Sequence, residues 1–311
     1  MATDPDKPPH GLSSAAYAIG NFDGVHLGHQ AVLHRTLELA HETARPAAVL
    51  TFEPHPADHF AGRPVVFRIT QPATKARIFE ELGFDGAVVF RFDSRLAAFS
   101  AEEFVEDVLV RRLAVSAVVV GCDFHFGKGR LGDAQFLTDA GSRFGFEVAI
   151  VEKVEGGRID GRRVLSSTSI RHALENGDVA NAATQLGRRY TICGTVVSGQ
   201  KLGRKLGTPT ANIVLELGNR LAYGVYAVCA RVGGKNMPAV ASFGIRPTVD
   251  AGPPLLEVHI LDFSGDLYGE VICVGFVERL RGEKKFDSLS ALAKQMEQDK
   301  REARDIFDRL G

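Results

Sequence analysis

Short apolar runs alternate with segments of helical periodicity between Ala15 and Glu175. Continuous apolar runs predict fully buried strands, and apolar residues recur at helical spacing between them. The predicted strands are Ala16–Ile19, Ala48–Phe52, Gly86–Phe90, Ala117–Val120 and Val148–Val151. The predicted helices are Gln30–Ala40, Ala73–Leu82, Ala101–Leu113 and Asp133–Phe144. This alternation predicts a parallel sheet with helices on both faces, whose ligands bind beyond the carboxyl ends of the strands.

The pattern changes after Gly187. Strand-like runs then follow one another, separated by Gly, Pro, Asn or Asp turns and without helical stretches between them. They are Thr191–Val197, Tyr223–Val232, Met237–Phe243, Leu255–Phe263 and Glu270–Val277. This succession predicts an antiparallel barrel or sandwich. A helix from about Ser288 to Leu310, capped by Asp287 or Ser288, is expected to close the chain with its charges in solvent.

Length and composition fit two ordinary globular domains. The chain has 311 residues, 45% of them hydrophobic and 24% charged. We place the boundary between Asn181 and Tyr190, which gives domains of residues 15–183 and 184–311. A formal net charge of −1 gives no indication of a nucleic-acid or anionic-membrane partner.

The sequence also predicts the compartment. Residues 1–14 lack the apolar segment of a signal peptide, and no apolar run approaches the ~18 residues that a spanning helix needs. The four cysteines lie far apart and without metal-ligand spacing: Cys122, Cys193, Cys229 and Cys273. They predict free thiols in a reducing compartment, and the predicted location is the cytoplasm.

A histidine loop joins the first predicted strand to the first helix. It reads Gly20-Asn21-Phe22-Asp23-Gly24-Val25-His26-Leu27-Gly28-His29. The spacing of His26 and His29 places both imidazoles on one face of a helix N-terminus, where N–H groups and the helix dipole favour phosphate. Gly28 carries no side chain, so phosphate can approach the backbone. Two imidazole donors there stabilise charge on a phosphorus under in-line attack, which predicts nucleotidyl transfer from ATP.

Three further motifs continue this half of the chain. They are Thr51-Phe52-Glu53-Pro54-His55-Pro56, Gly121-Cys122-Asp123-Phe124-His125-Phe126-Gly127 and Ser166-Ser167-Thr168-Ser169-Ile170-Arg171. Ser167 or Thr168 can cap the following helix, with Arg171 in its first turn facing a phosphate. With the histidine loop and Arg130-x-Gly132-Asp133, these motifs resemble the bacterial bifunctional riboflavin kinase/FAD synthetase family, in family order and nearly family spacing.

The resemblance implies a Rossmann-like nucleotidyltransferase domain that acts as an FMN adenylyltransferase. His26, His29 and Arg171 would then carry the transfer, with the FMN phosphate attacking the α-phosphorus of ATP. The binding residues that it implies are Gly20, Asn21, Phe22, Asp23, Gly24, Gly28, His55, Asp123, Phe124, Ser166, Ser167 and Thr168. His125 stands where the family more often has Arg or another polar residue, and we assign it no role.

Two other phosphate motifs are excluded. Residues 127–132 fit G-x-G-x-x-G, but they lie late in the predicted sheet, whereas that fingerprint belongs to a tight first strand-to-helix turn. A glycine loop over the flavin site is the better interpretation. The sequence has no G-x-x-x-x-G-K-[ST], so any chemistry with ATP avoids the P-loop.

A second phosphate motif opens the C-terminal half. Gly199, Gly203 and Gly207 form a loop whose backbone N–H groups can wrap phosphates. The following Pro209-Thr210-Ala211-Asn212 sets a hydroxyl and an amide oxygen two residues apart, which suits Mg²⁺ carried by ATP phosphates. Together they resemble the riboflavin kinase module, a small antiparallel β-barrel.

That module implies the remaining roles in the second half. Thr210 and Asn212 would bind Mg-ATP, and Glu257 would be the base for the ribityl 5′-hydroxyl of riboflavin. Arg246 lies in Gly244-Ile245-Arg246-Pro247-Thr248, which matches a family loop. The residues that depart from the family pattern are Ser242, Phe243, Thr208 and Arg189.

The sequence thus predicts riboflavin phosphorylation to FMN, followed by adenylylation to FAD with release of pyrophosphate. The partners are riboflavin, FMN and ATP, with Mg²⁺. One alternative is an adenylyltransferase for another phosphorylated acceptor, such as a nicotinate or pantetheine ester, which would not need Pro209–Asn212 and Glu257. The other is a barrel that senses flavin without catalysis, which Ser242 and Thr208 favour and the complete kinase motif disfavours.

Overall fold

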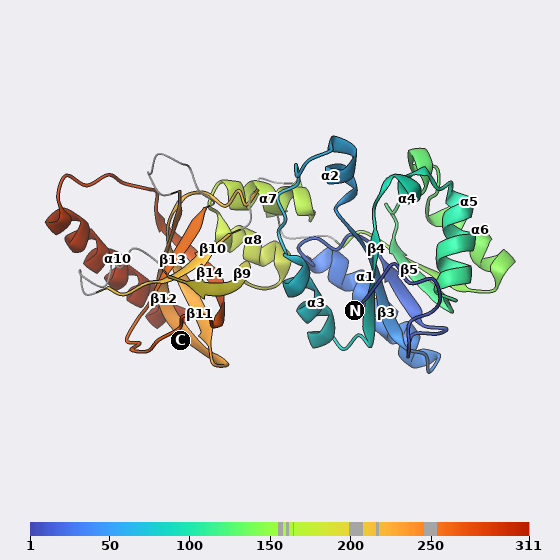
Figure 1. Ribbon diagram of the computed structural model, residues 1–311, viewed down its shortest axis with the longest axis horizontal. Coiled ribbons are helices and arrows are strands. Elements are labelled where there is room, and N and C mark those ends of the chain that lie inside the picture. Colours follow the sequence, from blue (N-terminus) through green and yellow to red (C-terminus); the bar gives the residue numbers. More distant parts are fainter. Residues whose placement is uncertain are drawn as a thin grey trace. The chain divides into compact units, whose positions relative to one another are not determined.

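The chain forms two compact units in a computed structural model (Figure 1). The structure describes residues 1–154, 158–159, 162–163, 165–198, 208–215, 218–245 and 254–310. The first unit contains Met1–Val66 and Thr70–Ser166, and the second contains Phe67–Ile69 and Ser167–Gly311. Each unit has its own core, so each is described separately.

The first unit is built on a parallel sheet. Its strands follow the order β1-β4-β3-β2-β5-β6, and every neighbouring pair runs parallel. They are β1 (Ala2–Thr3), β2 (Ala16–Ile19), β3 (Ala47–Glu53), β4 (Gly86–Arg91), β5 (Ala117–Gly121) and β6 (Glu147–Val151). The predicted parallel sheet is confirmed. The prediction that Val148–Val151 is fully buried is wrong, because β6 is an edge strand and Ile150 is exposed.

Helices cover both faces of this sheet. Alternate residues of β2 point to opposite sides, with Ala18 in one buried cluster and Tyr17 in the other. Helices α1 (Leu27–Glu42) and α3 (Pro72–Glu81) pack on the first side. On the second side lie the π-helical segment η1 (Phe104–Arg112) and α6 (Ala134–Phe144), as Figure 1 shows. The shorter elements are α2 (Pro56–Ala61), α4 (Ser94–Ala98), α5 (Ala101–Glu103), η2 (Lys128–Arg130), β7 (Arg158–Ile159) and β8 (Arg162–Arg163).

The second unit is a closed antiparallel barrel. The strand order is β10-β13-β12-β11-β14-β9, and each neighbouring pair is antiparallel. The strands are β9 (Thr191–Val197), β10 (Ala211–Val214), β11 (Gly224–Val232), β12 (Lys235–Gly244), β13 (Leu255–Ile260) and β14 (Val271–Arg281). Closure decides between the barrel and the sandwich that the sequence left open. The sequence did not predict β10 as a strand.

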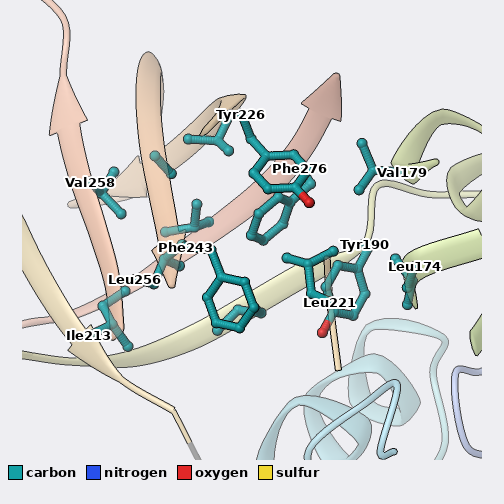
Figure 2. Packing of buried hydrophobic residues seen from close by; sticks show 14 of the residues in the cluster. Leu174, Val179, Tyr190, Ile213, Leu221, Tyr226, Phe243, Leu256, Val258 and Phe276 are labelled. Carbon is teal, nitrogen blue, oxygen red and sulfur yellow. The ribbon is translucent and has the colours of Figure 1, made fainter. Parts of the chain in front are cut away.

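Helices α7 (Ser167–Glu175) and α8 (Val179–Leu186) pack against the barrel. Leu174 and Val179 belong to the same buried cluster as Tyr190 and Phe276 of the barrel (Figure 2). Packing therefore joins Ser167–Leu186 to the second unit. The functional boundary near residue 183 stays a prediction.

Helix α10 (Leu289–Leu310) covers part of the outer barrel wall. Its Ile306 packs with Val225 and Val240. The buried carboxylate of Asp299 accepts hydrogen bonds from Nε of Arg281 at 3.0 and 3.2 Å and from Nη2 at 2.8 Å. Ser288 Oγ accepts a hydrogen bond from the backbone N–H of Ala291 at 3.1 Å, which confirms it as the cap. Among the described residues, no helix combines the length and apolar character needed to cross a bilayer.

One cysteine pair differs from the prediction. Cys193 and Cys273 form a disulfide, so the expectation of four free thiols is wrong for these two. The physical reason is the strand register, because β9 and β14 place the two residues directly opposite each other. Their separation of 80 residues conceals this pairing in the sequence. Cys122 and Cys229 are free and half-buried.

Candidate active sites

The polar motifs of the first unit follow the carboxyl ends of parallel strands. β2 ends at Ile19, β3 at Glu53 and β5 at Gly121, and the histidine, His55 and Asp123 motifs come directly after or at these ends. Parallel strands end at the same edge of a sheet, so the three motifs lie at the edge where such folds bind ligands.

The histidine loop has an unusual backbone. Phe22, Gly24 and Val25 have positive φ values of 49°, 89° and 42°. Glycine adopts this region readily, whereas a β-branched residue such as valine rarely does. Phe22 and Val25 are both buried in the cluster beneath the loop. Burial of these two side chains therefore stabilises a backbone that would otherwise be unfavourable.

His26 caps helix α1 with its own ring. Nδ1 of the buried His26 imidazole accepts a hydrogen bond from the backbone N–H of His29 at 3.2 Å. A neutral imidazole that accepts at Nδ1 carries its proton at Nε2. The rings of His26 and His29 stack with centroids 3.6 Å apart, so both histidines stand on one face of the helix start. In the neutral ring, this cap therefore places the proton of His26 at Nε2.

The absence of a side chain at Gly28 leaves room for the His26 ring. A Cβ added at Gly28 would lie 3.2 Å from Cε1 and Nδ1 of His26 and 3.3 Å from Cδ2 of Leu165. The side of Gly28 that a Cβ would occupy is therefore filled by protein atoms. The sequence-based explanation, close approach of phosphate, does not apply to that side.

The base of the loop is held by contacts between residues of the predicted motifs and two residues that the sequence did not single out, Thr70 and Lys75. The backbone oxygen of Asn21 accepts hydrogen bonds from Thr51 Oγ1 at 3.2 Å and Lys75 Nζ at 3.1 Å. Lys75 is buried and also pairs with Glu53 Oε1 at 3.1 Å. The buried Asp23 carboxylate accepts from the Thr70 backbone N–H at 3.0 Å. A lysine on the apolar face of a predicted helix was the available signal, because such a charge needs partners.

The rim of this edge carries aromatic and charged groups. His55 caps α2 by accepting from the Ala57 backbone N–H at 3.2 Å. Phe60 is 72% exposed and makes edge contacts with His59 and Phe92, with centroids 5.5 and 5.8 Å apart. Beyond β5, the exposed Asp123 pairs with Lys153 at 3.7 Å, and Phe124 stacks on Phe126.

The serine-arginine motif divides between the two units. Ser166 belongs to the first unit, and α7, which begins at Ser167, belongs to the second. Thr168 is exposed, and Nε of Arg171 donates to the Phe67 backbone oxygen at 2.8 Å within the second unit. The proposed partnership of Arg171 with the two histidines stays a prediction.

Two residues predicted for phosphoryl transfer, Asn212 and Glu257, lie in one row across the barrel with Ser242. Asn212 of β10 is opposite Glu257 of β13, which is opposite Ser242 of β12. The residues next to them, including Ile213 and Leu256, belong to the barrel core, so this row is on the outer wall. Asn212 is 4% exposed, whereas Glu257 is half-buried and Ser242 exposed. The register brings together an amide and a carboxylate that are far apart in sequence.

The oxygen donors suit a hard cation carried by phosphates. Nδ2 of Asn212 donates to the Thr210 backbone oxygen at 3.3 Å, which orients the amide. Mg²⁺ prefers oxygen ligands and usually binds through few protein groups together with substrate phosphates. In the part of the chain that the structure describes, no three His, Cys, Asp or Glu side chains group as metal ligands. The hydroxyl of Thr210 and the amide of Asn212 are nevertheless the oxygen-donor types that Mg²⁺ prefers.

Matches with protein families settle what the two units are. The model for FAD synthetase matches residues 9–168, and the model for riboflavin kinase matches residues 186–307. A bifunctional riboflavin kinase/FMN adenylyltransferase of Pseudomonas fluorescens is 45% identical over 299 residues, covering 96% of this chain and 94% of that protein. The chain belongs to the bifunctional riboflavin kinase/FMN adenylyltransferase family. The family predicted from the sequence motifs is thus confirmed.

Two further relatives cover nearly the whole chain. The Escherichia coli K12 bifunctional riboflavin kinase/FMN adenylyltransferase is 40% identical over 304 residues, covering 96% of each chain. A crystal structure of a protein named macrolide-efflux protein, from Streptococcus pneumoniae, is similar with a TM-score of 0.83 and 32% identity, covering 98% of this chain and 99% of that one. The two-unit fold of this family member is therefore a known arrangement of elements.

Four predicted site residues of this family member fall outside the described residues: Gly199, Gly203, Gly207 and Arg246.

The second unit has a cavity of about 420 Å³ beside the start of α10. Its lining residues are Lys284, Lys285, Phe286, Asp287, Ala291, Lys294, Gln295, Gln298 and Arg301. The sequence predicted the charges of this helix to be a solvated face. That prediction is wrong for Lys300, which is half-buried.

Proposed function

We propose that this chain phosphorylates riboflavin to FMN with ATP and then adenylylates FMN to FAD, releasing pyrophosphate. The observation that carries the proposal is the presence of two separate phosphate-chemistry groupings. One is the stacked pair His26 and His29 at the start of α1, and the other is the pair Asn212 and Glu257 on the barrel wall. Both steps consume ATP, which supports the cytoplasmic location predicted from sequence.

In the kinase step, Glu257 accepts the proton of the ribityl 5′-hydroxyl as that oxygen attacks the γ-phosphorus of ATP. Thr210 and Asn212 hold the Mg²⁺ that accompanies ATP, and this ion neutralises charge on the phosphate oxygens. Phosphoryl transfer depends mainly on positioning and charge neutralisation.

In the adenylyl step, the phosphate of FMN attacks the α-phosphorus of ATP directly and pyrophosphate leaves. His26, through Nε2–H, and His29 donate to phosphate oxygens whose negative charge grows in the transition state. Arg171 supplies a further positive charge. Neither histidine needs to form a covalent bond with the nucleotide.

The exposed aromatic group at the rim of the first unit supports flavin as the acceptor. The exposed ring of Phe60, which meets His59 and Phe92 edge-on, offers an aromatic face on which an isoalloxazine ring can stack. An adenylyltransferase for a nicotinate or pantetheine ester would not need the kinase residues of the barrel. A sensing barrel without catalysis would not need a carboxylate opposite Asn212.

The direct experiment is to incubate the purified chain with riboflavin, ATP and Mg²⁺ and to resolve the flavins chromatographically over time. The proposal expects FMN to appear first and FAD to follow. Formation of FAD from added FMN without any phosphorylation of riboflavin would favour the sensing barrel. Absence of both reactions with a folded protein would contradict the proposal.

A further inference from the structure

The segment before β10 is held by side chains from two other elements. The Pro209 backbone oxygen accepts a hydrogen bond from Nδ1 of His259, on β13, at 2.8 Å. Lys300, on α10, lies with its Nζ 3.5 Å from Oγ1 of the buried Thr208. Thr208 and Pro209 immediately precede Thr210, the proposed ligand of Mg²⁺.

This segment lies outside the strand ladder. The first paired residue of β10 is Ala211, opposite Val258, so Thr210 precedes the first ladder pair. Pro209 has no backbone N–H to donate, and its carbonyl is therefore its main-chain hydrogen-bonding group. A side-chain donor on this carbonyl restrains the peptide group that leads directly into Thr210.

The hydrogen bond defines the form of His259. A carbonyl oxygen only accepts, so Nδ1 of His259 must carry a proton. Burial lowers the pKa of His259 and favours the neutral ring, although the bond to Pro209 acts in the opposite direction. The charged groups of α10 that face it are Lys300 and Arg304, which also lower its pKa, and Glu297, which raises it. His259 is thus neutral with its proton at Nδ1.

We propose that His259 is a positioning residue of the kinase, which holds the Pro209 carbonyl so that the Thr210 hydroxyl meets the Mg²⁺ of bound ATP. This inference rests on the proposed function of Thr210. Lys300 supports the same segment through Thr208, a residue that departs from the phenylalanine often found in the family. A hydroxyl there gives the α10 ammonium group a partner that a phenyl ring does not offer.

Two substitutions at one position separate positioning from packing. His259→Leu removes the donor to the Pro209 oxygen. In His259→Asn the side-chain Nδ2 lies near the position of the imidazole Nδ1, so a donor to that oxygen is kept. The matched control is Asp262→Asn, which removes the ion pair between Asp262 and Arg304 of α10 but leaves Pro209 untouched. Circular dichroism and the melting temperature of the barrel report whether each variant is folded.

The measurements are calorimetric affinity for Mg-ADP, the Mg²⁺ concentration for half-maximal riboflavin phosphorylation, and ¹⁵N chemical shifts of the His259 ring. Loss of one hydrogen bond predicts an affinity for Mg-ADP about fivefold weaker in His259→Leu. The Mg²⁺ requirement should rise in parallel, and the KM for riboflavin should stay unchanged. His259→Asn and Asp262→Asn should remain within about twofold of the wild type, because the donor is kept. The ring shifts should report a proton at Nδ1.

Wild-type affinity for Mg-ADP in His259→Leu would overturn the proposal, and so would ring shifts showing the proton at Nε2. Equal losses in all three variants would indicate a general packing role and would also overturn it. If the wild type binds Mg-ADP in a His259-dependent way but never phosphorylates riboflavin, the proposed kinase function fails while the positioning role stands. If the kinase is active and His259→Leu leaves its affinity for Mg-ADP unchanged, the positioning role fails while the proposed kinase function stands.

Discussion

Asn212 and Glu257 face each other across the antiparallel strands β10 and β13, on the outer wall of the barrel. The residues on either side of them point into the core, so a register slip of one residue would move both polar groups inward. The apolar core therefore fixes the position of the proposed base relative to the proposed metal ligand.

This arrangement predicts different metal responses for two kinase variants. Thr210→Val keeps the shape of the side chain but removes the proposed Mg²⁺ ligand, whereas Glu257→Gln keeps the size but removes the proton acceptor. Both should lower FMN formation from riboflavin by at least about 10²-fold, as expected for loss of a general base or of a metal contact. Added Mg²⁺ should partly restore Thr210→Val and leave Glu257→Gln unchanged.

The measurement for these variants is the initial rate of riboflavin phosphorylation across a Mg²⁺ titration. Supplied FMN should still become FAD at near wild-type rate in both variants, which serves as the control. Full kinase activity in Glu257→Gln would remove Glu257 as the base, and full activity in both would contradict the kinase site.

Gly28→Ala should impair adenylyl transfer without unfolding the chain. The new Cβ would meet the His26 ring at 3.2 Å, so the ring must move by a few tenths of an ångström. Misplacement by about 1 Å costs about 10²-fold in rate, so roughly a tenfold loss of FAD formation is expected. Alanine also favours a helix by up to about 1 kcal/mol over glycine, so the melting temperature should not fall much. A wild-type rate of FAD formation would show that the His26 position is not critical.

Much of the fold was predictable because the local patterns are strong. Continuous apolar runs marked the central strands, and the predicted bounds of Thr191–Val197 are those of β9. β10 was missed because its four residues are short for a strand and overlap the phosphate motif. The edge position of β6 was also hidden, because an apolar run does not tell how many neighbours a strand has.

The site was predictable in its motifs and less so in its supports. His26, His29, Asn212 and Glu257 stand out by residue type and spacing. Lys75 can be noticed in the sequence only as a charge on the apolar face of a predicted helix, because its partners Asn21 and Glu53 are brought to it by the folding of distant segments. The contact of Gly28 with the His26 ring was not predictable for the same reason, since the position of that ring is known only from the fold.

The lowered pKa of His259 predicts a pH dependence of stability. A histidine whose pKa is depressed in the folded state binds protons more readily in the unfolded state. Its contribution to stability is therefore complete above the unfolded value of about 6.5 and is lost as pH falls toward the folded value. The melting temperature of the wild type should therefore fall more between pH 7 and pH 5 than the melting temperature of His259→Asn. Parallel profiles for the two proteins would contradict this prediction.

The disulfide predicts the pattern of cysteine reactivity. Alkylation of the unfolded chain without reductant should label Cys122 and Cys229. Cys193 and Cys273 should be labelled only after reduction. Replacing both disulfide cysteines by serine should destabilise the barrel by about 2–4 kcal/mol, as is typical for loss of such a bond. Labelling of all four residues in protein purified without reductant would contradict the pairing.

The most direct measurement of the central claim, two separate active sites in one chain, is the flavin profile of His29→Ala after incubation with riboflavin, ATP and Mg²⁺. The account predicts FAD formation lower by about 10²-fold, the loss typical of one donor to a developing oxyanion, while FMN accumulates at the wild-type rate. An equal fall in FMN and FAD formation, with the variant folded as judged by its circular dichroism, would contradict the account.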